Sequence, residues 1–424
     1  MSDAGERPLA GAAWLHAPAS RRLLNALTAR GRPARFVGGC VRDALRGREL
    51  SGRELDLATP ELPDEVQRLL RDDRIRAVPT GLEHGTVTAI IGGRRFEITT
   101  LRRDVATDGR RATVAFTDDF REDAARRDLT INAMSCDGEG RLFDYFGGRA
   151  DLAAGRIRFV GDGAARIAED YLRILRFFRF FAHYGREPVD ASALQACVAA
   201  AGQIERLSGE RIRTEMQRLL EAEDPLPALR LMDGAGVLEQ VAPGPVAFER
   251  LARLVALAPD ADALLRLAAL LRPPPAESRA AGWVAERWRL SNEQRDRLMQ
   301  LVQMPLPPLA APAAERRRAL HQMGKQLYID LVRLAAADAA GDPGVGLADA
   351  VVEAGRWAPK RLPVTGDDVT GFGLAPGPRV GELLRAIEAW WVERDFRPGR
   401  EACLAELCRL MAQEDGTSAV APSG

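Results

Sequence analysis

Residues 36–43 read FVGGCVRD, and residues 54–59 read ELDLAT. The first run has the pattern of an apolar strand that ends in a Gly-Gly turn, and the second is a short strand with two carboxylates. Side chains at positions i and i+2 of a strand point to the same face. Glu54 and Asp56 therefore share a face, while the leucines that follow each of them enter the core. Two neighbouring carboxylates repel each other unless a cation lies between them, and beside a phosphate-binding turn we expect Mg²⁺.

The glycine turn has the features of a phosphate site. Gly38 and Gly39 leave room for a phosphate to approach the backbone, the helix start that follows supplies free N–H groups, and Arg42 adds a full charge. With the carboxylate pair, these groups suit metal-assisted transfer of a nucleotidyl group. The alternative is an ordinary strand–turn–helix connection beside a solvated strand edge, which the length of the combined pattern disfavours.

The composition limits the class of protein. Sixty basic and 60 acidic residues leave no net charge, so a nucleic-acid partner must contact local basic patches. The five cysteines form no CxxC pattern, and we expect neither a zinc site nor a disulfide framework. No apolar signal core is present, and the richest apolar stretch, residues 263–271, is too short to span a bilayer. We therefore expect a soluble cytoplasmic protein with no membrane partner.

The pattern of elements changes along the chain. The first part is mixed, and two β-rich runs joined by Gly92-Gly93 predict a hairpin. From about residue 151 helical periodicity dominates, with continuous helices expected over residues 164–184 and 313–337. The predicted fold is an α+β head with a mixed sheet, followed by an all-α neck, body and tail.

A second motif, RRDLTINAM, occupies residues 126–134. We expect its adjacent arginines, Arg126 and Arg127, to open a helix and to bind triphosphate oxygens. Asp128 and Asn132 are spaced one helical turn apart, so they can hold the sugar or orient an arginine. The alternative is a capped helix with internal ion pairs.

A third motif, EDYLR at residues 169–173, suggests how a base is chosen. Within a helix, Asp170 and Arg173 share a face. The carboxylate accepts from the exocyclic amino group of cytosine or adenine, and the guanidinium donates to ring acceptors. Uracil and guanine place a carbonyl where the amino group should be, and each mismatch should cost roughly 1–3 kcal/mol. The alternative is a surface salt bridge worth a few tenths of a kcal/mol.

These motifs resemble those of the class II tRNA nucleotidyltransferases and bacterial poly(A) polymerases of the DNA polymerase β superfamily, strongly over roughly the first two hundred residues. The family's usual acidic pair is Asp-x-Asp, whereas this chain has Glu54, whose side chain is longer by about 1.5 Å. The resemblance implies a third carboxylate at Glu97, although a surface glutamate is the alternative. It also implies a mobile loop at residues 108–111, where the alternative is a solvated hairpin tip, and a bracing role for residues 210–215.

The resemblance further implies the activity and its partners. The expected reaction is template-independent addition of CCA to the 3′ end of tRNA from CTP and ATP, with release of pyrophosphate and two Mg²⁺ ions as cofactors. The alternatives are a poly(A) polymerase or an enzyme that adds only A, and a catalytically inactive RNA-binding relative.

The residues and domains that we expect to perform this reaction are as follows. The catalytic and metal-binding residues are Glu54 and Asp56, with Glu97 as a further metal ligand. The nucleotide-binding residues are Gly38, Gly39, Arg42, Arg127, Asp128, Asn132, Asp170 and Arg173. The domains are a nucleotidyltransferase head (1–150), a neck with base recognition (151–235), a tRNA-binding body and tail (236–414) and a disordered end (415–424).

Overall fold

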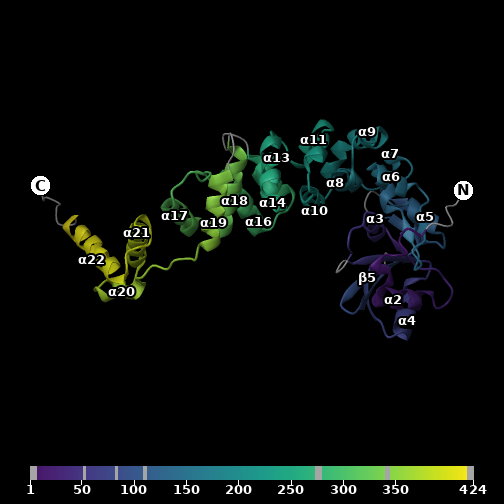
Figure 1. The fold of residues 1–424 in the computed structure, drawn as a ribbon, viewed down its shortest axis with the longest axis horizontal. Coiled ribbons are helices and arrows are strands. Elements are labelled where there is room, and N and C mark those ends of the chain that lie inside the picture. Colours follow the sequence, from purple (N-terminus) through teal and green to yellow (C-terminus); the bar gives the residue numbers. More distant parts are fainter. Residues whose placement is uncertain are drawn as a thin grey trace. The chain divides into compact units, whose positions relative to one another are not determined.

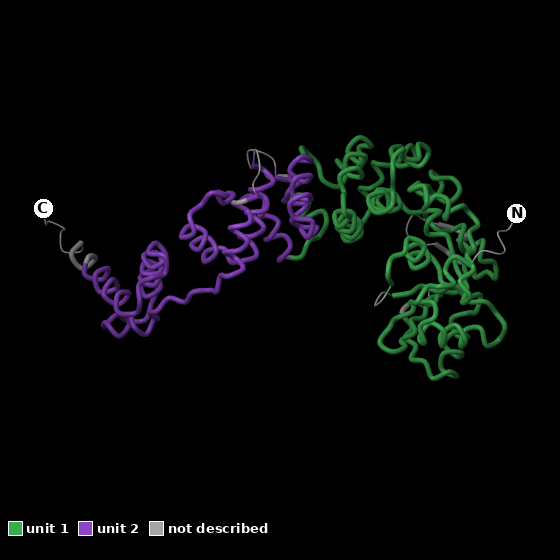
Figure 2. Tube along the Cα trace, in the orientation of Figure 1, with its two compact units in different colours: residues 1–245, 282–291 green, residues 246–281, 292–424 purple. Residues whose placement is uncertain are grey.

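The computed structural model describes residues 7–50, 54–81, 85–107, 112–272, 279–339 and 344–417. The loop expected at residues 108–111 lies outside this described part. The chain divides into two compact units, residues 1–245 with 282–291 and residues 246–281 with 292–424 (Figure 2).

The first unit is built on a seven-stranded sheet in the order β3-β4-β5-β2-β1-β8-β9. Its strands are β1 (Arg35–Val37), β2 (Leu55–Thr59), β3 (Arg76–Gly81), β4 (Thr86–Ile91), β5 (Arg94–Thr100), β8 (Ser135–Cys136) and β9 (Leu142–Phe143). β2 and β5 run parallel, and the other neighbours run antiparallel. Gly92 and Gly93 both have positive φ and connect β4 to β5, which confirms the predicted hairpin. β6 (Arg102–Thr107) and β7 (Ala112–Phe116) form a separate two-stranded sheet.

Short helices surround this sheet. They are α1 (Ala13–His16), α2 (Pro18–Thr28), α3 (Gly39–Leu45), α4 (Pro63–Asp72), α5 (Phe120–Ala125), the 3₁₀ helix η2 (Thr130–Asn132) and α6 (Gly148–Ala154). α2 packs on α4 (Figure 1). α4 contacts β3 and β4, and α3 packs on β1 and β2. Leu55 and Leu57 are fully buried, as the alternation of β2 predicts. The apolar side of β2 therefore anchors the strand, and its other side is available for chemistry.

The rest of the first unit is helical. Its helices are α7 (Gly163–Glu169), α8 (Leu172–Tyr184), α9 (Ala191–Ala199), η3 (Ala201–Arg206), α10 (Gly209–Leu220), α11 (Leu226–Gly234), α12 (Leu238–Val241) and most of α15 (Arg279–Arg287). The prediction of one continuous helix over residues 164–184 is wrong. Asp170 adopts an extended conformation between α7 and α8, and its side chain accepts a hydrogen bond from the Leu172 N–H. Aspartate favours such capping positions over helix interiors, which explains the break.

The second unit is formed by helices in its described residues. These are α13 (Phe248–Leu257), α14 (Ala263–Leu271), α16 (Asn292–Gln303), α17 (Ala313–Met323), α18 (Lys325–Asp338), α19 (Gly344–Arg356), α20 (Gly366–Gly371), α21 (Pro378–Glu393) and α22 (Arg400–Thr417). The single helix expected over residues 313–337 is wrong, because Gly324 has φ +79° and separates α17 from α18. α22 also includes residues 415–417, which were expected to be disordered, and residues 418–424 lie outside the described part. The predicted fold class, an α+β head followed by helices, is confirmed.

None of the helices in the described ranges combines the length and apolar character needed to cross a membrane.

Gly148, the first residue of α6, allows close packing against η2, and this contact yields a prediction. A Cβ atom there would lie 2.2 Å from the carbonyl oxygen of Thr130. We expect Gly148→Ala to displace η2 and to lower the free energy of unfolding by about 1–3 kcal/mol, measured by urea denaturation. Gly282→Ala in α15 is the matched control, because its Cβ would meet nothing within 4 Å. Equal stability of the two variants would contradict this account.

Candidate active site

Acidic residues gather on one face of the sheet, at β2 and β5. Asp56 of β2 stands directly opposite Glu97 of β5 in the parallel register. Glu54, just before β2, has its Oε1 atom 3.7 Å from the Nε atom of Arg95 on β5. Since Arg95 and Glu97 are two residues apart on one strand, they share a face. The structure thus brings together the three predicted carboxylates.

The charge of this cluster is poorly compensated. Asp56 is an exposed residue, yet neighbouring protein atoms partly desolvate its carboxyl. Partial desolvation and the negative charges of Glu97 and Glu54 raise the pKa of Asp56 to about 6, although Arg127 opposes this rise. Desolvation and the charge of Glu54 also raise the pKa of Glu97. A bound cation would relieve both effects.

The arrangement of these acids decides what kind of metal site it can form. Within the described ranges, no group of three or more His, Cys, Asp or Glu side chains is arranged to hold a metal ion. Mg²⁺ is commonly bound through one or two carboxylates, with substrate phosphates and waters as the remaining ligands. The carboxylates present therefore fit a site in which two acids bind Mg²⁺ and a nucleotide supplies further ligands, rather than a site made of protein side chains alone.

The glycine turn lies between β1 and α3. Gly38 has φ +69° and ψ −122°, a conformation that side chains disfavour. A Cβ atom on Gly38 would lie 3.0 Å from Nη1 of Arg127. Glycine at this position therefore lets the Arg127 guanidinium approach the turn, where a phosphate would meet both.

Arg127 is held in this position by two contacts. Its Nη2 donates to Oδ2 of Asp123 at 3.2 Å, and its Nη1 donates to the carbonyl of Asn132 at 3.5 Å. Asp123 is buried and also accepts from Arg126, at 2.7 Å. Sequence analysis missed Asp123, although its spacing of three and four residues from the arginines was an available signal. The expectation that these arginines open a helix is wrong, because Arg126 is the C-cap of α5.

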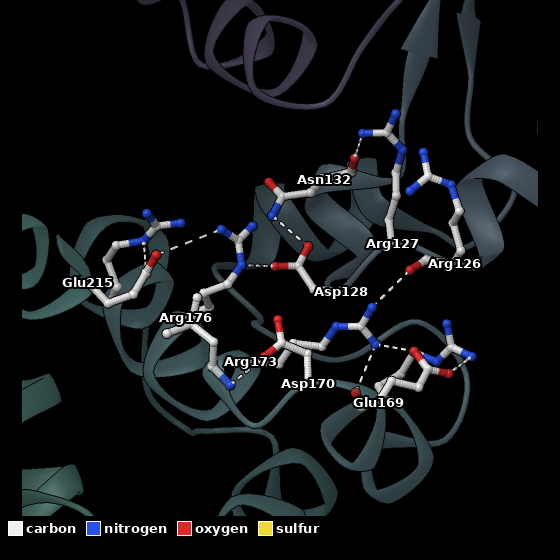
Figure 3. A network of polar contacts seen from close by, with 12 residues as sticks. Arg126, Arg127, Asp128, Asn132, Glu169, Asp170, Arg173, Arg176 and Glu215 are labelled. Atoms are coloured by element: carbon white, nitrogen blue, oxygen red, sulfur yellow. Dashed lines mark hydrogen bonds and ion pairs between the residues drawn. The ribbon is translucent and has the colours of Figure 1, made fainter. Parts of the chain in front are cut away.

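Arg42, Asn132 and Asp128, three of the predicted nucleotide-binding residues, are linked by hydrogen bonds, and Figure 3 shows the part from Asn132 through Asp128 to Arg176. Nη1 of Arg42 donates to Oδ1 of Asn132 at 2.5 Å, and Nδ2 of Asn132 donates to Oδ1 of Asp128 at 3.1 Å. Nε of Arg176, from α8, donates to Oδ2 of Asp128 at 2.6 Å. All three predicted residues are buried. These polar contacts orient the groups around the turn and tie them to α8; sequence analysis did not single out Arg176.

Arg173 lies in the first turn of α8, and its guanidinium is held from three sides (Figure 3). Nη1 donates to the carbonyl of Arg166 at 2.8 Å and to the carboxylate of Glu169. Nη2 donates to the carbonyl of Arg126 at 3.2 Å. The orientation of Arg173 is therefore determined before any base binds.

Asp170 is held by a different element. Its Oδ2 accepts from Nη2 of Arg211 on α10 at 2.6 Å, while Oδ1 caps α8 through the Leu172 N–H. The expectation that Asp170 and Arg173 share a helical face is wrong, because Asp170 lies in the break between two helices. Arg211 and Glu215 belong to the motif at residues 210–215, and Glu215 forms an ion pair with Arg179 of α8 at 3.1 Å.

Known proteins match most of the length of this chain. Residues 34–158 match the family model for the poly A polymerase head domain, and residues 188–248 match that for the probable RNA and SrmB-binding site of polymerase A. The chain is 32% identical over 393 residues to the mitochondrial CCA tRNA nucleotidyltransferase 1 of Mus musculus, covering 88% of this chain and 86% of the relative. It is 30% identical to the CCA-adding enzyme of Levilactobacillus brevis, covering 87% and 92% of the two chains.

A solved structure is also similar. The Bacillus stearothermophilus CCA-adding enzyme in complex with CTP superposes with a TM-score of 0.73 at 26% identity, covering 97% of this chain and 100% of that one.

The raised pKa of Asp56 leads to a prediction about pH. A carboxyl whose pKa is higher in the folded than in the unfolded state destabilises the fold as pH rises from about 4 to about 6, and the cost is complete above that range. We expect Asp56→Asn to raise the melting temperature in metal-free buffer near pH 7.5, with a much smaller rise near pH 4.5. Calorimetry at both pH values tests this, with the exposed Asp64→Asn of α4 as control. An equal rise at both pH values would exclude the proposed repulsion.

Proposed function

The chain belongs to the class II CCA-adding enzyme and poly(A) polymerase family, and from this premise we propose that it adds CCA to the 3′ end of tRNA with CTP and ATP and without a nucleic-acid template. Relatives that match most of the chain are named for this activity. The observation that carries the proposal is the Asp56–Glu97 register, which places uncompensated carboxylates near the Gly38 turn and Arg127.

The reaction at this site joins a nucleotide to tRNA. The 3′-hydroxyl oxygen of the tRNA attacks the α-phosphorus of CTP or ATP, the bond to the β-phosphate oxygen breaks, and pyrophosphate leaves. Glu54 and Asp56, with Glu97 beside them, would hold Mg²⁺, which would supply positive charge to the phosphates and lower the pKa of the attacking hydroxyl when bound. Gly38, Gly39 and Arg127 bind the triphosphate.

Three further residues hold the phosphate-binding groups in position. Arg42 lies beside the turn, with Nη1 bound to Asn132 and Nε bound to Asp43. Asp128 and Asn132 act mainly through the arginines that they orient, because their side chains bind Arg176 and Arg42.

Asp170 and Arg173 select the incoming base in this proposal. Their neighbours Arg211 and Glu169 hold them by charged hydrogen bonds, so both groups are oriented in advance. A cytosine or adenine edge can share these groups, because a carboxylate accepts several hydrogen bonds and a guanidinium donates up to five. A uracil or guanine carbonyl facing Asp170 would leave an acceptor opposite an acceptor.

The domain roles follow the same proposal. Residues 1–150 form the catalytic head, residues 151–235 the neck that selects the base, and residues 236–414 the body and tail that bind tRNA. The Mg²⁺ requirement of the reaction and the cytoplasmic location of the protein stay predictions.

The test of this function uses tRNAs that lack one, two or three terminal nucleotides, with labelled CTP and ATP. We expect addition of C, C and then A. Addition of A alone would identify an A-adding enzyme, and long A tails would identify a poly(A) polymerase. No incorporation would identify a catalytically inactive RNA-binding relative.

Asp56→Ala should lower the rate at least about a thousandfold, because the variant loses several kcal/mol of charge stabilisation in the transition state. Its affinity for tRNA, measured by filter binding, should match the wild type. Asp64→Ala, an exposed change on α4, is the matched control. Turnover near wild type in Asp56→Ala would refute the metal-binding role.

Base selection gives a separate prediction. Arg173→Ala should reduce the preference for CTP over UTP in kcat/KM by about 10- to 100-fold, the range expected for one bidentate base contact. Arg218→Ala, an exposed arginine change on α10, should leave the preference unchanged. If UTP stays as strongly excluded in Arg173→Ala as in the wild type, Arg173 does not read the base.

A further inference from the structure

Tyr184 is the last residue of α8, the helix whose first turn carries Arg173. We propose that Tyr184 is a positioning residue that sets the orientation of the base-selecting end of α8 relative to the phosphate-binding turn before α3. This inference rests on the proposed function and assigns a role to a residue outside the motifs that identify the family.

The hydroxyl of Tyr184 connects two segments that are distant in sequence. It donates to Oδ1 of Asp43 on α3 at 2.7 Å, across 141 positions of the chain. It also accepts from Nη1 of Arg48 at 3.1 Å. Tyr184 and Asp43 are buried, with 8% and 5% of their surfaces exposed, so water competes little for these hydrogen bonds.

The ring of Tyr184 acts on the same part of α3. The guanidinium carbon of Arg42 lies 4.4 Å from the ring centroid, and that of Arg48 lies 4.9 Å away. Nε of Arg42 also donates to Oδ1 of Asp43 at 3.0 Å. The Arg42–Asp43 pair is therefore held by both the face and the hydroxyl of one tyrosine.

A second connection joins α8 to this region from its middle. Arg176 of α8 binds Asp128, Asp128 binds Asn132, and Asn132 accepts from Arg42. With the contacts of Tyr184, these bonds form a closed ring that begins and ends on α8. A helix held at one point can pivot about it, whereas two points separated along the axis prevent that rotation.

The contacts of Tyr184 affect both the phosphate-binding turn and the end of α8 that selects the base. The backbone N–H of Arg42 donates to the carbonyl of Gly38 at 3.0 Å, so the residue that Tyr184 contacts is tied to the turn itself. The other end of α8 carries Arg173. Loss of the contact at Tyr184 leaves the polar contacts of Arg173 with the Arg126 carbonyl and of Arg176 with Asp128, both in the N-terminal half of α8. The C-terminal half then loses its hydrogen bond to α3, and the base and triphosphate subsites can misalign.

Tyr184→Phe tests this role, because it removes the hydroxyl and keeps the ring. We expect the KM for CTP to rise about tenfold, equivalent to about 1.4 kcal/mol. We also expect the preference for CTP over UTP in kcat/KM to narrow, while kcat for CTP changes little. Tyr328→Phe on α18 is the matched control, since Tyr328 is also a buried tyrosine but lies in the second unit.

A purely structural role predicts a different result. Partial unfolding lowers the active fraction, so kcat falls equally for all nucleotides while KM and the CTP preference stay constant. That result, or no change at all, overturns the proposal. If Tyr184→Phe fails to fold, Arg48→Gln carries the test, because Arg48 is more exposed and its loss should shift KM and preference in the same direction.

Calorimetric titration with CTP and with UTP separates this proposal from the proposed function, because it requires no turnover. If the wild type binds CTP but transfers nothing, the function fails, and weaker, less selective CTP binding by Tyr184→Phe still supports the positioning role. If binding is the same in both proteins, the positioning role fails. If the wild type binds neither nucleotide, both proposals fail.

Discussion

The ion pair between Asp128 and Arg176 is the contact on which the candidate site depends most. It joins the segment beside the glycine turn to the helix that carries Arg173. Burial disfavours the Asp128 carboxylate, yet the charge of Arg176 and the hydrogen bonds from Arg176 and Asn132 keep its pKa well below the usual value. Asp128 is buried and Arg176 is half-buried, so removing Arg176 would leave a buried carboxylate without compensation, which costs up to about 3–5 kcal/mol. The pair therefore demands a definite arrangement of head and neck, whatever its net contribution to stability.

The acidic cluster on β2 and β5 differs from this ion pair, because its negative charges face one another. Asp128 has its charge matched by a partner, whereas Asp56 faces Glu97 across two paired strands, and the backbone register keeps them together. The fold tolerates this repulsion because the buried leucines of β2 anchor the strand from the other side. Uncompensated charge persists in proteins mainly where a ligand completes the balance. A nucleotide with its bound cation carries the groups needed here, with positive charge for the acids and phosphate oxygens for Arg127.

Local patterns were enough to predict the mixed head, the helical remainder and the paired acids at β2, whereas Glu97 of β5 was expected only from the family resemblance. The alternation around Asp56 and the Gly92-Gly93 turn depend on neighbours in sequence, and both predictions agree with the structure. Periodicity could not show that Asp170 leaves the helix, because the residues around Asp170 have a helical pattern and the preference of aspartate for capping positions competes with it. Nor could it show that Arg42 is buried against Tyr184, since that contact joins segments more than a hundred positions apart. Long-range polar contacts of this kind carry no local signal.

Glu54 stands where the sequence resemblance leads us to expect an aspartate, and its surroundings suggest how the longer acid is accommodated. Its carboxylate lies 3.7 Å from the Arg95 guanidinium, and both side chains are largely exposed. An exposed pair of this type contributes little, about 0–1 kcal/mol, so Glu54 can exchange Arg95 for a cation at small cost. The extra methylene gives the reach for both positions, whereas an aspartate would stay closer to the strand. Under the proposed function, Arg95 is a partner that reduces repulsion among the acids while no nucleotide or metal is bound.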